Sequence, residues 1–233
     1  MTGRVAPRAR RISIVIPVLN EAQTLVGCLD GLQAYRAQGH EVIVVDGGSH
    51  DGTPALARPR ADHVLVSAPG RARQMGQGAR IAQGDVLLFL HADTRLPDAA
   101  CDTILSALQT AARWGRFDVR LSGSAPALRL IEFMINLRSR WTRIATGDQA
   151  MFVTRELFHA AGGFDDIPLM EDIALSRRLK KLAPAACLRQ RVVTSSRRWE
   201  EHGVLKTVLL MWRLRLAYWL GADPARLVRQ YYR

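Results

Sequence analysis

Short apolar runs alternate with longer stretches of mixed polarity through the first half of the chain. Four such runs cover residues 12–17, 41–46, 63–67 and 85–90, and they read ISIVIP, EVIVVD, HVLVS and DVLLFL. Continuous β-branched runs of this length are typical of buried strands. The stretches between them, which begin near Asn20, Pro54 and Arg71, have helical character. Strands that alternate with helices form a parallel sheet, so we predict an α/β fold with a mostly parallel central sheet flanked by helices.

Past Leu96 the pattern is less regular. It predicts helices over residues 99–114, 127–144, 156–161 and 171–182 and strands over residues 117–122 and 150–154, and the residues that follow are basic and mostly helical. A chain of 233 residues is long enough to bury one good core. We therefore expect a basic tail (1–11), one α/β domain (12–200) and a basic, amphipathic helical extension (201–233).

The net charge of +12 is distributed unevenly along the chain. Residues 1–11 carry four arginines and no acid, residues 12–176 carry fifteen Lys/Arg against eighteen Asp/Glu, and residues 177–233 carry fourteen against three. The basic end fits an anionic partner such as a membrane, a nucleic acid or a phosphate-rich substrate, or it only improves solubility. The usual nucleic-acid-binding motifs are absent, so we predict no nucleic-acid partner.

Several features bear on where the protein works. The three widely spaced cysteines indicate reduced thiols, and the apolar run after the basic tail is short and contains Pro17, so we expect no signal peptide and a cytoplasmic protein. No run approaches the ~20 apolar residues of a spanning helix. Residues 127–144 and 204–220 combine apolar faces with Trp and basic residues, which suits helices lying on the inner face of the cell membrane. The alternative is that these faces pack on the sheet or form a homodimer contact.

Three of the four predicted strands in the first half are followed by acidic residues. Glu21 follows the first strand, Asp46 ends the second, and Asp93 follows the fourth. Ligands of parallel α/β sheets bind beyond the carboxyl ends of the strands. One such acid is commonly a turn former, but three in one half of the chain indicate a shared binding crevice.

These residues belong to six segments that occur in the order found in family 2 glycosyltransferases. The segments are IPVLNE (16–21), VDGGSHDGT (45–53), GRARQMGQGARIAQGD (70–85), FLHADT (89–94), GGFDD (162–166) and MEDIALSRRLKK (170–181). The chain resembles that family, whose members have the nucleotide-diphospho-sugar transferase fold called GT-A, over residues 12–200. Within the family it resembles most a small bacterial group with LHADT and GDQ signatures, which is similar to carotenoid-acid glycosyltransferases.

The resemblance implies a donor pocket at the strand ends. Its nucleotide-binding residues would be Pro17, Asn20, Glu21, Asp46, Gly48, Arg71, Arg73 and Ala92. Asp46 would read the base and Glu21 would lie near the ribose, while Arg71 or Arg73 would reach the base or the diphosphate. The alternatives are that Asn20 is only a helix N-cap and that the two arginines are solvated helix charges.

A metal site is also implied. Asp93 matches the last carboxylate of the family's Asp-X-Asp motif, and His91 replaces the first. Mn²⁺ or Mg²⁺ at this place would neutralise charge on the leaving nucleoside diphosphate. His91 would either coordinate the metal, which favours Mn²⁺, or serve as a packing residue.

The catalytic base is implied at the start of the helix predicted over residues 171–182. Asp172 matches it, with Glu171 as the alternative, and an inverting transfer needs such a carboxylate to take the proton of the attacking acceptor hydroxyl. The competing interpretation is that both acids only complement the helix dipole.

The remaining motif residues are assigned to the acceptor or sugar pocket. They are Gly147, Asp148, Gln149, Gly163, Phe164, Arg198 and Trp199. Arg198 and Trp199 match the Gln-X-X-Arg-Trp motif of processive members only in part, because Ser195 replaces the glutamine.

We therefore predict an inverting, metal-dependent glycosyltransferase that moves a sugar from a nucleoside-diphosphate sugar, UDP by family habit, to a hydroxyl or carboxyl of an acceptor that is lipid-linked or isoprenoid. Two other interpretations stay open. A nucleotidyltransferase would carry a glycine-rich loop after the first strand, which IPVLNEAQT lacks. An inactive glycosyltransferase-like binding protein would fit the missing first aspartate.

Overall fold

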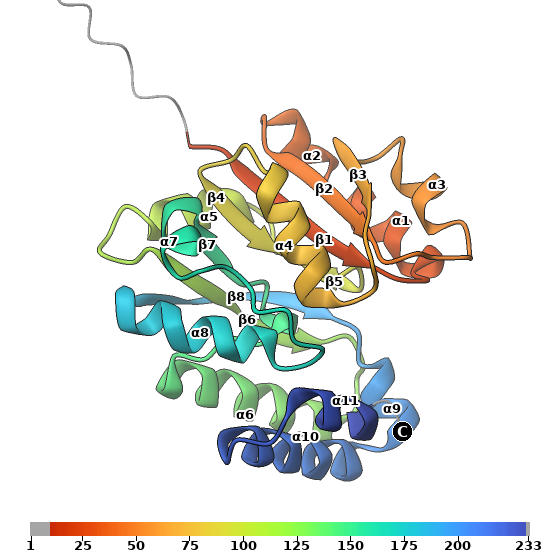
Figure 1. Ribbon diagram of the computed structural model, residues 1–233, viewed down its shortest axis with the longest axis vertical. Coiled ribbons are helices and arrows are strands. Elements are labelled where there is room, and N and C mark those ends of the chain that lie inside the picture. Colours follow the sequence, from red (N-terminus) through yellow and green to blue (C-terminus); the bar gives the residue numbers. More distant parts are fainter. Residues whose placement is uncertain (1–9, 232–233) are drawn as a thin grey trace, which may run out of the picture.

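An eight-stranded sheet runs through the centre of the molecule (Figure 1). The computed structural model describes residues 10–231, apart from the side chains of His202 and Leu205. The predicted basic tail, residues 1–11, lies outside the described residues except for Arg10 and Arg11. Helices cover both faces of the sheet, and the C-terminal helices form an additional layer.

The sheet is mixed and mostly parallel, which confirms the predicted fold class. Its strands are β1 (Ile12–Val18), β2 (Glu41–Asp46), β3 (His63–Val66), β4 (Val86–Phe89), β5 (Thr94–Arg95), β6 (Trp114–Leu121), β7 (Phe152–Thr154) and β8 (Ala185–Thr194). They are ordered β3-β2-β1-β4-β7-β6-β8-β5. The first four strands in this order are parallel, β7 is antiparallel to β4 and to β6, β8 is parallel to β6, and β5 is antiparallel to β8.

The helices fill the connections between these strands. They are α1 (Ala22–Asp30), α2 (Gln33–Ala37), α3 (Thr53–Ala57), α4 (Arg71–Ile81), α5 (Ala100–Ala107), α6 (Pro126–Thr142), α7 (Arg155–Ala160), α8 (Glu171–Leu182), α9 (Arg197–His202), α10 (Val204–Trp219) and α11 (Pro224–Tyr231). A single 3₁₀ turn, η1 (Gly147–Gln149), precedes β7.

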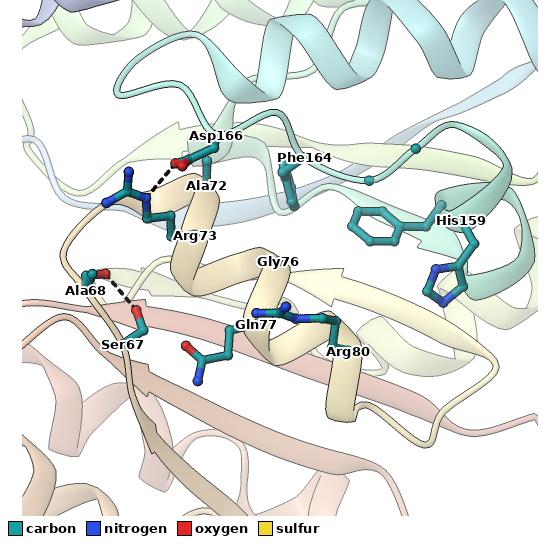
Figure 2. A pocket seen from close by; sticks show the side chains of 13 residues that line it. Ser67, Ala68, Ala72, Arg73, Gly76, Gln77, Arg80, His159, Phe164 and Asp166 are labelled. Carbon is teal, nitrogen blue, oxygen red and sulfur yellow. Dashed lines mark hydrogen bonds and ion pairs between the residues drawn. The ribbon is translucent and has the colours of Figure 1, made fainter.

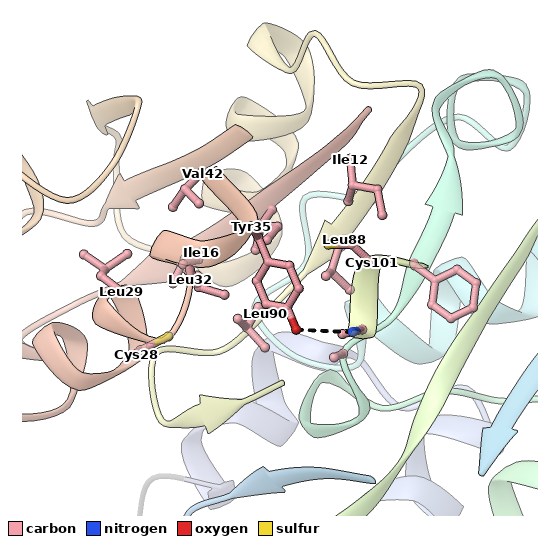
Figure 3. Packing of buried hydrophobic residues seen from close by; sticks show 14 of the residues in the cluster. Ile12, Ile16, Cys28, Leu29, Leu32, Tyr35, Val42, Leu88, Leu90 and Cys101 are labelled. Atoms are coloured by element: carbon pink, nitrogen blue, oxygen red, sulfur yellow. Dashed lines mark hydrogen bonds between the residues drawn. The ribbon is translucent and has the colours of Figure 1, made fainter. Parts of the chain in front are cut away.

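The two faces of the sheet bury different sets of side chains. Ile14 and Ile16 of β1 face a cluster that includes α1 and α5, whereas Val15 faces α4, α7 and α8. This is the alternation expected along a strand that is buried on both faces. Figure 3 shows the first cluster, in which Tyr35 of α2 reaches toward the start of α5 and accepts a hydrogen bond from the amide of Ala100.

On the other face α4 lies unusually close to the sheet. A Cβ added at Gly78 would lie 2.4 Å from Cγ1 of Val15, so only glycine allows this approach. The close approach brings the N-terminal turn of α4 toward the carboxyl ends of β1 and β2.

Two predictions about the second half of the chain were wrong. The helix predicted over residues 99–114 ends at Ala107, and Trp114 instead begins β6. The residues after α8 were expected to be mostly helical, but Ala185–Thr194 forms β8. Consecutive polar residues, Arg189 to Arg191, interrupt its apolar pattern and are exposed, and pairing with β6 stabilises the strand despite them.

The C-terminal helices pack on the body through two clusters. Leu214 of α10 and Leu227 of α11 are buried against Leu169 and Met170, the residues before α8. Val204 and Val208 of α10 pack against the cluster around Leu128 and Ile131 of α6. As a result α6 (green) and α10 (blue) lie side by side at the bottom of Figure 1. In the part of the chain that the structure describes, no helix is long and apolar enough to cross a membrane.

Candidate active site

The carboxyl ends of β1 and β2 meet in register, and Asp46 closes the loop that follows them. Val18 pairs with Asp46, whose carboxylate accepts hydrogen bonds from the amides of Gly48 and Ser49, both at 2.9 Å, and from the Ser49 hydroxyl. Asp46 is buried, with 1% of its surface exposed, so these donors hold its carboxylate beneath the loop. Gly48 has φ of +93°, a conformation that glycine adopts without strain.

Asn20 and Glu21 connect the β1 loop to the β2 loop. The Asn20 amide donates to Ser49 Oγ at 2.8 Å, and its Oδ1 accepts from the amide of His50 at 2.9 Å. Asn20 is therefore not the N-cap of α1; that position is Glu21, whose side chain accepts from Thr24 Oγ1 at 2.7 Å instead of capping the helix. Pro17 is buried one position before the end of β1.

Gln74 of α4 was missed by sequence reasoning. Its buried Nε2 donates to the carbonyls of Val18 at 2.8 Å and Val45 at 2.7 Å, so one amide group holds the ends of β1 and β2 together. The sequence offers no signal for this role, because a glutamine within a polar helix is most often solvent-exposed.

The end of β4 carries Ala92 and Asp93 into a cavity of about 400 Å³. Gln23 and Thr24 of α1, Arg95, and Thr194 and Ser195 after β8 also line this cavity. Asp93 is partly exposed, and its Oδ1 accepts from Thr94 Oγ1 at 3.3 Å.

His91 packs against η1. A Cβ at Gly147 would lie 2.6 Å from both Cε1 and Nε2 of His91, so the imidazole occupies the space that any larger residue at position 147 would need. Burial, and then the charge of Arg71, lowers the pKa of His91 to about 3, so the ring is neutral at physiological pH. The sequence left two roles open for His91, metal coordination and packing, and this placement is compatible with packing.

Asp172 lies in the first turn of α8 and contacts the same η1 turn. Its Oδ2 accepts from the Gly147 amide at 2.8 Å, and its Oδ1 accepts from the amide of Ile173 at 2.7 Å. Burial raises the pKa of Asp172, and these amide donors oppose the shift. Met170, just before the helix, has φ of +70°, which turns the chain sharply into α8.

Glu171 lies beside Asp172 but is more deeply enclosed, with 6% of its surface exposed. Burial, and then the charge of Asp172, raises the pKa of Glu171 to about 7, while Arg71 opposes the shift. The charge of Arg71 acts on both Glu171 and His91, and His91 packs on Gly147, so the start of α4, the loop after β4, η1 and the start of α8 lie near one another.

The rest of η1 carries unsatisfied polar groups. Gln149 is fully buried; its Oε1 accepts from the amide of Thr146, and its Nε2 has no hydrogen-bond partner in the described part of the chain. Oδ1 of Asp148 is likewise buried without a partner there. Two cations that sequence reasoning treated only as helix charges, Arg138 and Arg215, lie near Asp172.

Three predicted residues lie elsewhere. Arg73 pairs with Asp166 at 2.7 Å beside a second cavity, of about 670 Å³, between α4 and α7 (Figure 2). Gly163 and Phe164 also line this cavity, and the Phe164 ring packs on Phe89 with centroids 4.8 Å apart. Asp46, Asp93 and Asp172 do not line this cavity, so it is distinct from the cavity that Asp93 lines.

Arg198 and Trp199 pack within the protein, at the junction with the C-terminal helices. The Arg198 guanidinium donates to the Tyr231 carbonyl at 2.6 Å and lies 3.6 Å from the centroid of that ring. Trp199 packs against the cluster around Leu128 and Ile131. Both side chains help to attach the C-terminal helices to the body, and their assignment to the acceptor pocket stays a prediction.

The donor set around Asp93 is compatible with a substrate-bridged metal. Among the described residues no group of three His, Cys, Asp or Glu side chains is placed to hold a metal ion. Mg²⁺ usually binds through one or two carboxylates together with substrate phosphates and water. A single accessible carboxylate such as Asp93 fits that arrangement.

Solved structures share this architecture. A mannosyltransferase from Pyrobaculum calidifontis, in complex with GDP-Man and Mn²⁺, superposes with a TM-score of 0.63 at 23% identity, covering 91% of this chain and 62% of that one. TarS from S. aureus, in complex with UDP-GlcNAc, gives a TM-score of 0.63 at 16% identity, covering 79% of this chain and 58% of that one. The fold is therefore that of the GT-A glycosyltransferases.

Sequence comparison agrees with the fold. A PGL/p-HBAD biosynthesis glycosyltransferase from Mycobacterium bovis is 37% identical over 98 residues, which are 39% of this chain and 38% of the relative. The chain thus spans less than half the length of that curated relative. The sequence profile described as "Glycosyl transferase family 2" matches residues 13–164, and the chain belongs to this family.

Proposed function

We propose that the protein is an inverting glycosyltransferase in which Asp172 is the catalytic base. The observation that carries this proposal is the contact between Asp172 and Gly147, next to His91 at the end of β4. It brings the acid of α8 to the edge of the sheet that also carries Asp46 and Asp93. The proposal extends to residues 12–200 as the catalytic domain.

The geometry supports a base at position 172. The two amides fix the carboxylate, and its raised pKa makes it a better proton acceptor than a solvated aspartate. In the transfer, the acceptor oxygen bonds to the anomeric carbon and its proton passes to Asp172. The bond from that carbon to the diphosphate oxygen breaks, and the nucleoside diphosphate leaves with the electron pair.

Glu171 is the alternative base, but its surroundings favour a supporting role. It is the more buried of the two, and at neutral pH it is partly protonated. A protonated neighbour leaves Asp172 free to ionise, because two adjacent carboxylates repel each other when both are charged.

The donor is proposed to be a nucleoside-diphosphate sugar, with UDP as the nucleotide. Support comes from two carboxylates, Asp46 at the end of β2 and Glu21 in the loop after β1, which hydrogen bonds join to the loop after β2, and from Arg71 at the N-terminus of α4. Helix N-termini favour phosphate groups. The TarS complex contains UDP-GlcNAc and the Pyrobaculum complex contains GDP-Man, so both nucleotides belong in the test.

Mn²⁺ or Mg²⁺ is the proposed cofactor, held by Asp93 together with the diphosphate. When bound, the ion supplies positive charge that stabilises the leaving nucleoside diphosphate. His91 is neutral and packs on Gly147, so Asp93 is the protein's proposed contribution to this site.

The acceptor is proposed to be lipid-like and reached at an anionic membrane surface. Exposed apolar residues form one row on each of two neighbouring helices. They are Leu130, Phe133, Met134, Leu137 and Trp141 on α6, and Leu209, Trp212, Leu216 and Trp219 on α10, with Leu220 directly after it. Exposed Lys206 and Arg213 flank the second row.

The two rows face away from the body of the protein. On α6 the opposite side binds β6, where Asn136 pairs with the backbone of Val119 and Arg140 with Asp118. On α10 the opposite side is buried through Leu214. Apolar rows rich in Trp and bordered by basic residues are typical of helices that lie in a lipid interface. The proposed location is the inner face of the cell membrane.

A thermal-shift panel of nucleotide sugars, with and without Mn²⁺ or Mg²⁺, tests the proposal. We expect one UDP-sugar to raise the melting temperature in the presence of metal, and Asp93→Ala to abolish the metal dependence. Release of pyrophosphate from a nucleoside triphosphate would instead identify a nucleotidyltransferase. Donor binding without hydrolysis or transfer would identify an inactive binding protein.

A further inference from the structure

Arg138 of α6 is a buried cation with unused hydrogen-bond donors. Its Nε and Nη2 are buried, and neither has a partner in the part of the chain that the structure describes. Burial, and then the charge of Arg215, lowers the pKa of Arg138 to about 10. Leaving such donors unpaired is unfavourable, so they are expected to serve a ligand.

Arg215 of α10 approaches the same place from the neighbouring helix. The preceding residue, Leu214, is buried against Met170 at the start of α8, and α10 also packs along α6 through Val204 and Val208, so Arg215 lies near both Asp172 and α6. Its charge lowers the pKa of Asp172 as well as that of Arg138. Within residues 10–231, neither Arg138 nor Arg215 makes a salt bridge within 4.0 Å. The carboxylates nearby do not saturate them: Asp172 already accepts two amides, and Asp148 keeps an unpaired Oδ1.

Two adjacent guanidinium groups repel each other unless an anion lies between them. Each can donate two parallel hydrogen bonds to a phosphate, which makes arginine pairs well suited to bind this group. Asp148 and Asp172 restrict where an anion can bind, because it must contact both arginines and stay away from these two carboxylates.

The helices that carry Arg138 and Arg215 indicate that these arginines serve the acceptor and not the donor. On the donor side, Arg71 of α4 lies near Glu171 and His91. Arg138 and Arg215 come from α6 and α10, the two helices whose outer faces carry the exposed apolar rows. A lipid anchored at those rows would present its head group to the inner side of the same helices.

We infer that Arg138 and Arg215 bind a phosphate group carried by the acceptor, next to the hydroxyl that Asp172 deprotonates. The acceptor is then an amphipathic, anionic lipid. The assignment to the acceptor depends on the proposed function, but the anion site itself does not.

The test is a titration with methyl phosphate followed by ³¹P NMR, with Mg²⁺ and saturating UDP present. We expect Arg138→Gln and Arg215→Gln each to weaken methyl phosphate binding on the order of ten-fold, and to change UDP affinity less than about two-fold. Arg229→Gln, which removes an exposed charge from α11, is the matched control and should bind methyl phosphate like the parent protein. Arg138→Lys and Arg215→Lys keep the charge without the planar fork and should give intermediate losses.

The possible outcomes separate the alternatives. Equal loss of UDP and methyl phosphate binding would assign the arginines to the donor diphosphate and overturn the acceptor assignment. If the parent protein does not bind methyl phosphate, or if all variants bind it equally, Arg138 and Arg215 do not form an anion site. Failure to bind UDP, with methyl phosphate binding still lost in the two Gln variants, would reject the proposed function and retain the anion site. If either Gln variant fails to fold, the Lys variants test the proposal instead. Unchanged methyl phosphate binding in both Lys variants would overturn the role of the planar guanidinium group.

Discussion

The backbone amide of Gly147 lies 2.8 Å from Oδ2 of Asp172 and donates a hydrogen bond to it. This bond joins the turn before β7 to the first turn of α8. Asp172→Asn keeps an oxygen that accepts the bond but removes the basic carboxylate. We expect donor binding to persist and sugar transfer to fall by about 10²–10⁴-fold, the usual contribution of a general base.

Nucleoside diphosphate release, with binding measured separately, checks this prediction. Asp165→Asn is the control, since Asp165 is an exposed residue whose carboxylate pairs with Arg178. Full transfer activity in Asp172→Asn, with loss only in Glu171→Gln, would move the base to Glu171.

The contact between Gly147 and His91 predicts a rescue experiment. A methyl group at position 147 would lie 2.6 Å from two ring atoms of His91, so Gly147→Ala must displace the ring or the η1 turn that holds Asp172. We expect a strong loss of transfer, and we expect a second change, His91→Ala, to restore part of it by vacating the space. If the double variant is no better than Gly147→Ala, steric conflict with His91 is not the cause.

Glu171 predicts how stability depends on pH. Its folded-state pKa of about 7 lies above the ordinary value of 4.5, so the folded protein holds this proton more tightly than the unfolded chain does. Its contribution to stability is complete below about pH 4.5 and is lost as pH rises through about 7. From the size of the shift the loss is on the order of 3 kcal/mol.

Glu171→Gln removes this titration. Compared with the parent protein, the variant should gain stability progressively between pH 5 and about 8, measured by urea unfolding at several pH values. A constant difference between the two proteins across this range would show that Glu171 does not titrate there.

Much of the first half of the molecule was predictable because its strands are buried on both faces. Residues 41–46 form a strand with no exposed position, so the sequence of the strand is apolar nearly throughout. The prediction failed at β8, where Arg189 and Arg191 are exposed and pairing with β6 supplies the stability. Such pairing depends on a distant strand and leaves no local pattern.

Prediction of the candidate site met the same limit, because contacts between distant elements leave no local pattern in the sequence. Asp172 stands in a motif, and the structure joins it to Gly147, another motif residue. Arg138 and Arg215 occupy amphipathic helices, where sequence alone does not distinguish a solvated arginine from a buried one. Arg198 also stands in a motif, yet its partner is Tyr231, which only the packing of α11 brings into reach.

Gln74 predicts a link between stability and donor binding. Gln74→Ala leaves the carbonyls of Val18 and Val45 without their side-chain donor, which should destabilise the fold by about 2 kcal/mol and weaken UDP binding by loosening the ends of β1 and β2. Gln77→Ala, one turn later and partly exposed, is the control, because the hydrogen bond that its side chain donates to the Val66 carbonyl is long, at 3.4 Å. Calorimetric binding and thermal unfolding measure the two effects; equal effects in both variants would contradict the structural role of Gln74.

The exposed rows of α6 and α10 predict binding to lipid. Trp141 and Trp219, which are 87% and 67% exposed, should insert into vesicles of phosphatidylcholine with phosphatidylglycerol. Trp141→Ser combined with Trp219→Ser should reduce co-sedimentation several-fold, and high salt should release the parent protein. Leu182→Ser, an exposed apolar residue at the end of α8, should have no effect. Unchanged sedimentation of the double variant, or equal binding to neutral vesicles, would contradict the prediction that these rows bind anionic lipid.

The cluster that buries Leu169 and Met170 has a consequence for how the molecule is assembled during synthesis. The strands that carry Asp46 and Asp93 emerge from the ribosome early, whereas Leu214 and Leu227, which cover the entry to α8, are made much later. The segments proposed to bind the nucleotide are therefore complete on the ribosome before α10 and α11, which pack against the start of the helix that carries Asp172. Docking of these two helices is thus among the last steps in the assembly of the proposed active site.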